Sequence, residues 1–114
     1  MATVEITREN FDEVIANNPF VVIDFWASWC PPCRQFGPIF ERASERHDDI
    51  VFGKIDTEAQ RELQSAFEVQ SIPTITVVRD ATIIHHQPGA LNAQQLDTLL
   101  DQARAVNMAE LEKA

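Results

Sequence analysis

The chain has few cysteines, few glycines and few basic side chains: two Cys, three Gly and nine Lys plus Arg among 114 residues. Two cysteines cannot supply a structural zinc site, which needs four ligands, and they do not make a disulfide framework. The three histidines add no ligand pattern, since His47 is isolated and His85 and His86 are adjacent. We therefore expect surface histidines and no bound metal, with a metal cluster shared between two chains as the alternative.

Positive charge is scarce, because 18 acidic residues against nine basic ones leave a net charge of −9. No basic stripe is present to neutralise phosphates, which argues against nucleic-acid binding and against binding to an anionic membrane surface. The acidic residues are dispersed, and we interpret them as a solvated surface. No apolar run is long enough to cross a membrane. The first residues lack the basic and apolar regions of a signal peptide, which predicts a cytoplasmic protein.

Low-complexity tracts, internal repeats and linkers are also missing from the sequence. A chain of this length is suited to one hydrophobic core. We therefore predict a single domain over residues 1–107. The remaining residues, 108–114, are expected to extend the last helix or to fray.

Hydrophobic periodicity predicts strands that alternate with helices. Residues 20–26 are almost wholly apolar, which is typical of a strand buried on both faces. The Pro-Pro pair at 31–32 opens a helix that Pro38 is expected to kink, and Thr7 and Asn92 are expected to cap the first and last helices. This order predicts an α/β fold with a parallel sheet and an added antiparallel hairpin. The predicted strands cover 4–6, 20–26, 50–55, 74–78 and 82–86, and the predicted helices cover 8–17, 31–46, 58–67 and the residues after Asn92.

The two cysteines form a Cys-x-x-Cys pair, Cys30 and Cys33, where a strand is expected to end and a helix to begin. The N–H groups and the positive dipole end of a helix N-terminus stabilise a thiolate. This position favours dithiol chemistry over an inert buried pair. Asp24 interrupts the preceding apolar strand, and burial would raise its pKa toward a value that suits a general base for a thiol. The alternative is a carboxylate that reaches solvent at a strand end.

These residues carry a resemblance to the thioredoxin family that spans roughly residues 3–106. The resemblance implies the thioredoxin fold, a central mixed five-stranded sheet flanked by four helices. It also implies a protein-disulfide reductase, a thiol–disulfide oxidoreductase that serves electron transport and cell redox homeostasis. The matching positions are Asp24-Phe-Trp-Ala-x-Trp-Cys-x-Pro-Cys33, Pro38, Lys54, Ile72-Pro73-Thr74 and Gly89.

The resemblance assigns catalytic roles to four residues. Cys30 would attack a disulfide of the substrate, and the more buried Cys33 would then resolve the mixed disulfide. Asp24 would take the proton from Cys33 through a water molecule. Lys54 matches a family position near this carboxylate and would temper its charge, and a surface lysine with a solvated ammonium group is the alternative.

The resemblance further implies a shallow substrate-binding groove around the cysteines. Pro73 matches a cis-proline of the family, although the sequence does not fix the isomer. Pro31 stands where the family usually has Gly, and its effect on the redox potential has no predicted sign. Trp26 is expected to pack beneath the same loop. The residues expected to bind substrate are Trp29, Pro31, Pro32, Ile72, Pro73 and Gly89.

The implied partners are disulfide-containing substrate proteins and thioredoxin reductase, an NADPH-dependent flavoprotein that would regenerate the dithiol. The chain itself would bind no cofactor and would act as a monomer. Two alternatives stay open at this point. A disulfide oxidase or isomerase would use the same chemistry in the opposite direction, and a non-catalytic adaptor would bind partners irrespective of redox state.

Overall fold

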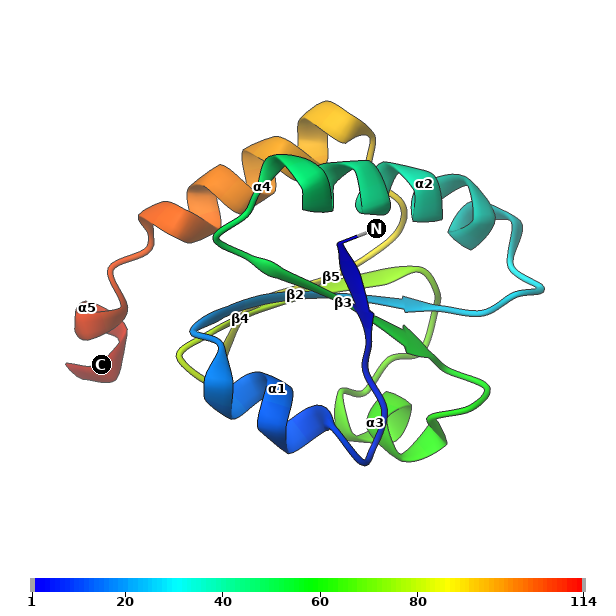
Figure 1. Cartoon of the computed structure of the whole chain (residues 1–114), viewed down its shortest axis with the longest axis horizontal. Coiled ribbons are helices and arrows are strands. Elements are labelled where there is room, and N and C mark those ends of the chain that lie inside the picture. Colours follow the sequence, from blue (N-terminus) through cyan, green and yellow to red (C-terminus); the bar gives the residue numbers. More distant parts are fainter. Residues whose placement is uncertain (1, 114) are drawn as a thin grey trace.

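Residues 2–113 are described by a computed structural model, in which five strands form one sheet (Figure 1). The order of the strands across this sheet is β1-β3-β2-β4-β5. The strands are β1 (Thr3–Glu5), β2 (Phe20–Trp26), β3 (Val51–Asp56), β4 (Thr74–Arg79) and β5 (Thr82–Pro88). The helices are α1 (Phe11–Asn17), α2 (Pro31–Arg46), α3 (Arg61–Ala66), α4 (Ala93–Ala105) and α5 (Met108–Lys113).

β2 lies at the centre of the sheet, with β3 parallel to it on one side and β4 antiparallel to it on the other. β1 pairs parallel with β3, and β5 pairs antiparallel with β4, as the predicted hairpin requires. Figure 1 shows α2 and α4 above the sheet and α1 and α3 below it. Because helices cover both faces, nearly all of β2 is buried, which explains its apolar run. The predicted mixed five-stranded sheet is confirmed.

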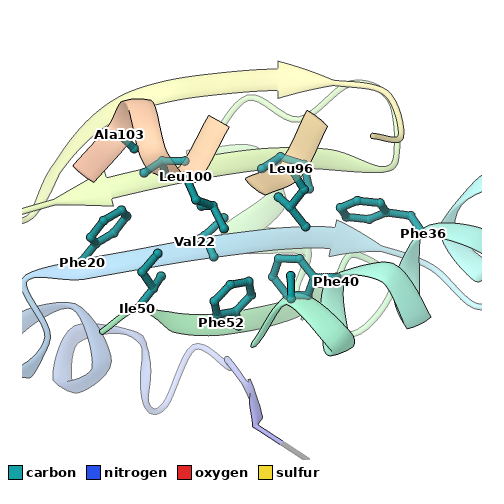
Figure 2. Close-up of a cluster of buried hydrophobic side chains, with 12 residues drawn as sticks. Phe20, Val22, Phe36, Phe40, Ile50, Phe52, Leu96, Leu100 and Ala103 are labelled. Atoms are coloured by element: carbon teal, nitrogen blue, oxygen red, sulfur yellow. The ribbon is translucent and has the colours of Figure 1, made fainter. Parts of the chain in front are cut away.

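Hydrophobic clusters fill both faces of the sheet. The cluster between the sheet and the helices α2 and α4 is drawn in Figure 2, where Phe40 of α2 lies near Phe52 of β3. The centres of these two rings are 5.0 Å apart. Since side chains alternate along a strand, Asp24 lies on the same face as Phe20 and Val22, the face that α2 and α4 cover. The cluster on the opposite face contains Ile6, Val21, Ile23, Phe25, Ile55, Leu63, Val69 and Val78.

Two helices begin later than the sequence predicts. In each case a side-chain oxygen accepts a backbone N–H group and closes a turn before the helix. α1 begins at Phe11 instead of position 8, and Thr7 is not its cap. The Asn10 side chain accepts a hydrogen bond from the Thr7 N–H at 2.7 Å and closes a turn before the helix. In the same way, Asp56 Oδ1 accepts the Glu58 N–H at 2.9 Å, and α3 begins only after this turn.

The residues after α4 form a helix of their own, so the described residues contain five helices instead of the predicted four. Asn92 caps α4 as predicted. Val106 then adopts an extended backbone and ends α4, and the Asn107 side chain accepts N–H groups of the next turn. Neither extension of α4 nor fraying describes residues 108–113, and Ala114 lies outside the described residues. Over residues 2–113, the helices lack the length and apolar character that crossing a bilayer requires.

The hairpin between β4 and β5 turns at Asp80 and Ala81, whose φ angles are positive, at 50° and 62°. A left-handed backbone costs a residue with a Cβ atom about 1 kcal/mol or more, whereas glycine adopts it freely. We expect Ala81→Gly to raise the free energy of unfolding by about 0.5–1 kcal/mol, after the greater unfolded-state entropy of glycine is subtracted. Urea denaturation measures the change. Ala90→Gly, at an exposed residue without a positive φ, is the control and should lower stability; a loss in both variants would contradict the prediction.

Candidate functional site

Cys30 and Cys33 lie at the N-terminus of α2 and are joined by a disulfide. Cys30 is the N-cap residue, and its Cα lies 5.2 Å from the Cα of Cys33. The Cys33 N–H donates a hydrogen bond to the Cys30 sulfur at 3.2 Å. In this oxidised form both residues are 3% exposed, so the predicted greater burial of Cys33 is not observed.

The two prolines that begin α2 decide which backbone donors face the Cys30 sulfur. Pro31 and Pro32 have no N–H groups, so Cys33 is the first residue of the helix that can donate to this sulfur. That N–H group and the helix dipole both stabilise negative charge on Cys30. In the reduced protein this arrangement favours a Cys30 thiolate, the form that attacks disulfides.

Asp24 is fully buried in the central strand β2. Neither of its carboxyl oxygens has a hydrogen-bond partner in the described part of the chain. Burial therefore raises the pKa of Asp24 to about 7, although the positive charge of Lys54 acts to lower it. The carboxyl does not reach solvent, which removes the alternative interpretation. A group with this pKa can both accept and release a proton near neutral pH.

Lys54 is the neighbour of Asp24 across the β2–β3 pair and lies on the same face of the sheet. Its ammonium group lies 5.1 Å from the centre of the Trp26 ring, a cation–π distance. The side chain is half-buried. Since the Asp24 oxygens are not hydrogen-bonded to this ammonium group, Lys54 acts on the carboxyl through its electric field.

The loop that precedes β4 faces the disulfide. The Ile72–Pro73 peptide bond is cis, and the Ile72 carbonyl oxygen lies 3.7 Å from the Cys30 sulfur. The Gly89 N–H donates a hydrogen bond to the Pro73 carbonyl at 2.8 Å and so holds Gly89 beside the same loop. The φ of Gly89 is +102°, which a residue with a side chain rarely adopts. Ile72, Pro73 and Gly89, distant in the sequence, are thus gathered near Cys30.

A groove of about 410 Å³ lies beside Cys30, and we call it the front groove. Its lining includes the predicted residues Trp29, which is 62% exposed, Pro31, Pro32 and Ile72. Apart from these and Cys30, the lining residues are polar and were not predicted. The first two, Thr57 and Glu58, follow the C-terminal end of β3, the sheet edge at which the cysteines also lie, and that position is the signal that could have found them. The lining residues are Trp29, Cys30, Pro31, Pro32, Thr57, Glu58, Gln64, Gln70, Ser71 and Ile72.

A second hollow, of about 270 Å³, borders Cys33, and we call it the rear hollow. Trp26 of β2 and Lys54 of β3 form its sheet side. Sequence reasoning missed Gly37 and Glu41, although their spacing from Cys33 places them on the same face of α2. The lining residues of the rear hollow are Trp26, Cys33, Arg34, Gly37, Pro38, Glu41 and Lys54.

Comparison with known proteins identifies what this arrangement is similar to. A family model described as Thioredoxin matches residues 2–102. A relative from Streptomyces coelicolor that bears the name thioredoxin 2 is 53% identical over 113 residues, covering 99% of this chain and 84% of the relative. Thioredoxin C-3 of Corynebacterium nephridii is 40% identical over 100 residues, covering 87% of this chain and 69% of the relative.

Solved structures show the same likeness in three dimensions. A structure of Plasmodium falciparum thioredoxin superposes with a TM-score of 0.80 at 30% identity and covers 86% of this chain and 96% of the other. A mutant thioredoxin from Halobacterium salinarum superposes with a TM-score of 0.85 at 26% identity and covers 92% of this chain and 93% of the other. The predicted thioredoxin fold is therefore confirmed.

Proposed function

The chain belongs to the thioredoxin family and is a thiol–disulfide oxidoreductase that reduces protein disulfides, and from this premise we propose which residues carry each step. The observation that carries the proposal is the position of Cys30, at the N-cap of α2 with the Cys33 N–H on its sulfur. In the reduced protein, the Cys30 thiolate attacks one sulfur of a substrate disulfide. A bond forms between Cys30 and that sulfur, and the other substrate sulfur leaves as a thiolate.

Cys33 completes the reaction. Its thiol loses a proton, and the resulting thiolate attacks Cys30 in the mixed disulfide. The bond between Cys30 and the substrate breaks, the second substrate thiolate is released, and the Cys30–Cys33 disulfide remains on the protein. Two electrons have then moved from the dithiol to the substrate.

Asp24 is the proposed base for Cys33. Its buried carboxyl has a pKa of about 7, which matches the pH at which it must accept the proton. A water molecule would carry the proton between the two groups; the rear hollow borders Cys33, whereas Asp24 is fully buried and does not line it. Lys54 adjusts the charge of the carboxyl through its field.

The front groove is the proposed binding site for an extended substrate segment. The Ile72 carbonyl, beside the Cys30 sulfur, can pair with the backbone of such a segment, as in strand addition. Trp29, Pro31 and Pro32 offer it an apolar wall. Pro73 and Gly89 support this surface from the neighbouring loop.

We also propose the partners and the location of the protein. An NADPH-dependent thioredoxin reductase would return the disulfide to the dithiol, and a reducing cytoplasm would supply the electrons. Thioredoxins in bacteria such as Streptomyces coelicolor are the relatives that support this proposal. We further propose that the chain works as a monomer, with the front groove free for substrates.

A coupled assay tests the proposed electron flow. The oxidised protein, NADPH, thioredoxin reductase and a disulfide-containing protein are mixed, and NADPH consumption is followed by absorbance. Consumption that depends on this chain is the expected result. If the reductase does not reduce the chain, and if its reduction potential lies well above that of glutathione, an oxidase function is supported instead.

Trp29 provides a test of the front groove. We expect Trp29→Ala to lower kcat/KM for a protein disulfide about tenfold, because loss of an exposed aromatic contact costs about 1.4 kcal/mol of binding free energy. A small aromatic disulfide, which does not extend along the groove, should be reduced at nearly the wild-type rate. Ile83→Ala on β5, also exposed but outside the groove, is the matched control. Equal losses for both substrates would contradict the proposed binding site.

A further inference from the structure

The mechanism leaves one carboxylate of the rear hollow without a role. Glu41 Oε1 is buried and has no hydrogen-bond partner among residues 2–113. Glu41 lies about two helical turns after Cys33 on α2, with Gly37 between them, so these three residues form one stripe along the helix. All three line the rear hollow together with Lys54. An acidic residue with one buried oxygen and a lysine thus line the same hollow.

The Lys54 ammonium group lies close to α2 at Gly37. A Cβ atom at Gly37 would lie 3.6 Å from Lys54 Nζ, so this group lies directly against α2. Lys54 therefore has two acidic residues nearby, one fully buried and one half-buried. One is Asp24, its neighbour on β2, and the other is Glu41, with which it shares the rear hollow.

We propose that Glu41 is a positioning residue for the proton transfer from Cys33: it attracts the Lys54 ammonium group into the rear hollow and thereby weakens its attraction to Asp24. This proposal rests on the proposed role of Asp24 as base. Lys54 lowers the pKa of Asp24, so an acidic group that competes for Lys54 keeps that pKa near neutrality. Repulsion between the two carboxylates acts in the same direction.

Other charged groups around Lys54 are exposed or already engaged. Glu5 is its neighbour on β1 and is exposed, and Arg34 of α2 lines the rear hollow but is also exposed. Asp56, on the same face of β3, accepts a backbone N–H of the following turn. Because solvent screens exposed charges, the buried oxygen of Glu41 exerts the stronger effect on Lys54.

The test is a pH titration of Asp24 in the oxidised protein, monitored through the ¹³C NMR signal of its carboxyl group. We expect Glu41→Gln to lower the pKa of Asp24 by roughly half a unit. Glu41→Asp keeps the charge and should restore most of the wild-type value. Glu45→Gln removes a charge from an exposed residue one turn further along α2 and should leave the titration unchanged. In a Lys54→Met background, Glu41→Gln should have a much smaller effect.

An unchanged Asp24 titration in Glu41→Gln, or an equal shift in Glu45→Gln, would overturn the proposal. A shift that persists in full in the Lys54→Met background would overturn it as well, because Glu41 would then not act through Lys54. These titrations do not depend on catalysis. A separate measurement tests the role of Asp24 as base. That role is wrong if the pH profile of the resolving step does not follow the pKa of Asp24 in both the wild type and Glu41→Gln.

Discussion

We expect Cys30→Ser to abolish disulfide reduction, and Cys33→Ser to stop the reaction at the mixed disulfide, with the substrate still attached. Serine in place of Cys30 is a poor nucleophile at neutral pH, so turnover should fall by about four orders of magnitude or more. With Cys33→Ser the Cys30 thiolate still forms, because its donor is the backbone N–H of residue 33. The mixed disulfide then has no thiol to resolve it.

Intact-protein mass spectrometry separates the two outcomes. Each variant is reduced, freed of reductant and mixed with a disulfide-containing protein. Cys33→Ser should gain the mass of one substrate chain, and Cys30→Ser should gain none. An adduct on the Cys30→Ser variant would show that Cys33 is the accessible nucleophile and would reverse the proposed order. Unaltered biological activity of the Cys30→Ser, Cys33→Ser double variant, which has no thiol left to reduce a disulfide, would support the adaptor alternative.

The local features of the fold could be read from the sequence because short-range chemistry determines them. An apolar run interrupted only by Asp24 predicted β2, and Asn92 predicted the start of α4. The predicted starts of α1 and α3 were wrong, because Asn10 and Asp56 each close a turn with a neighbouring N–H before the helix begins. A side chain that competes with a helix for the first donors leaves little trace in the hydrophobic pattern.

The candidate site was only partly predictable, because its parts meet through the order of the strands. The resemblance to a family placed Ile72, Pro73 and Gly89 near Cys30, but the residues alone could not show the sheet order that brings them there. Glu41 was missed for a related reason. Its spacing from Cys33 was visible, whereas the presence of Lys54 beneath that face of α2 depends on how the helix crosses β3.

The stability of the oxidised protein should fall as the pH rises from about 4 to 7, and Asp24→Asn should remove this dependence. The pKa of Asp24 is raised from 3.8 to about 7 in the folded protein, because burial disfavours the charged carboxylate. Between these values the unfolded chain has released the proton and the folded protein still holds it. The contribution of Asp24 is therefore fully present below pH 3.8 and is lost as the pH passes through 7.

The expected size of the loss is about 4 kcal/mol, at 1.36 kcal/mol for each unit of pKa difference. Urea denaturation at a series of pH values measures it as a change in the free energy of unfolding. In Asp24→Asn the curve should be flatter by this amount, whatever constant offset the buried amide adds. Asp12→Asn, at an exposed position of α1, is the control and should keep the wild-type slope. A wild-type slope in Asp24→Asn would show that another group causes the pH dependence.

Asp24 thus lowers the free energy of unfolding as the pH rises to neutrality. Its presence is explained if the carboxyl takes the proton of Cys33, since general base catalysis contributes typically about 10²–10⁴-fold. Asp24→Asn should therefore slow release of the substrate from the mixed disulfide at pH 7 by about 10²-fold, while the attack by Cys30 changes much less. Stopped-flow measurement of the two phases distinguishes them. If both phases slow equally, the carboxyl acts on the site as a whole and not on the proton of Cys33.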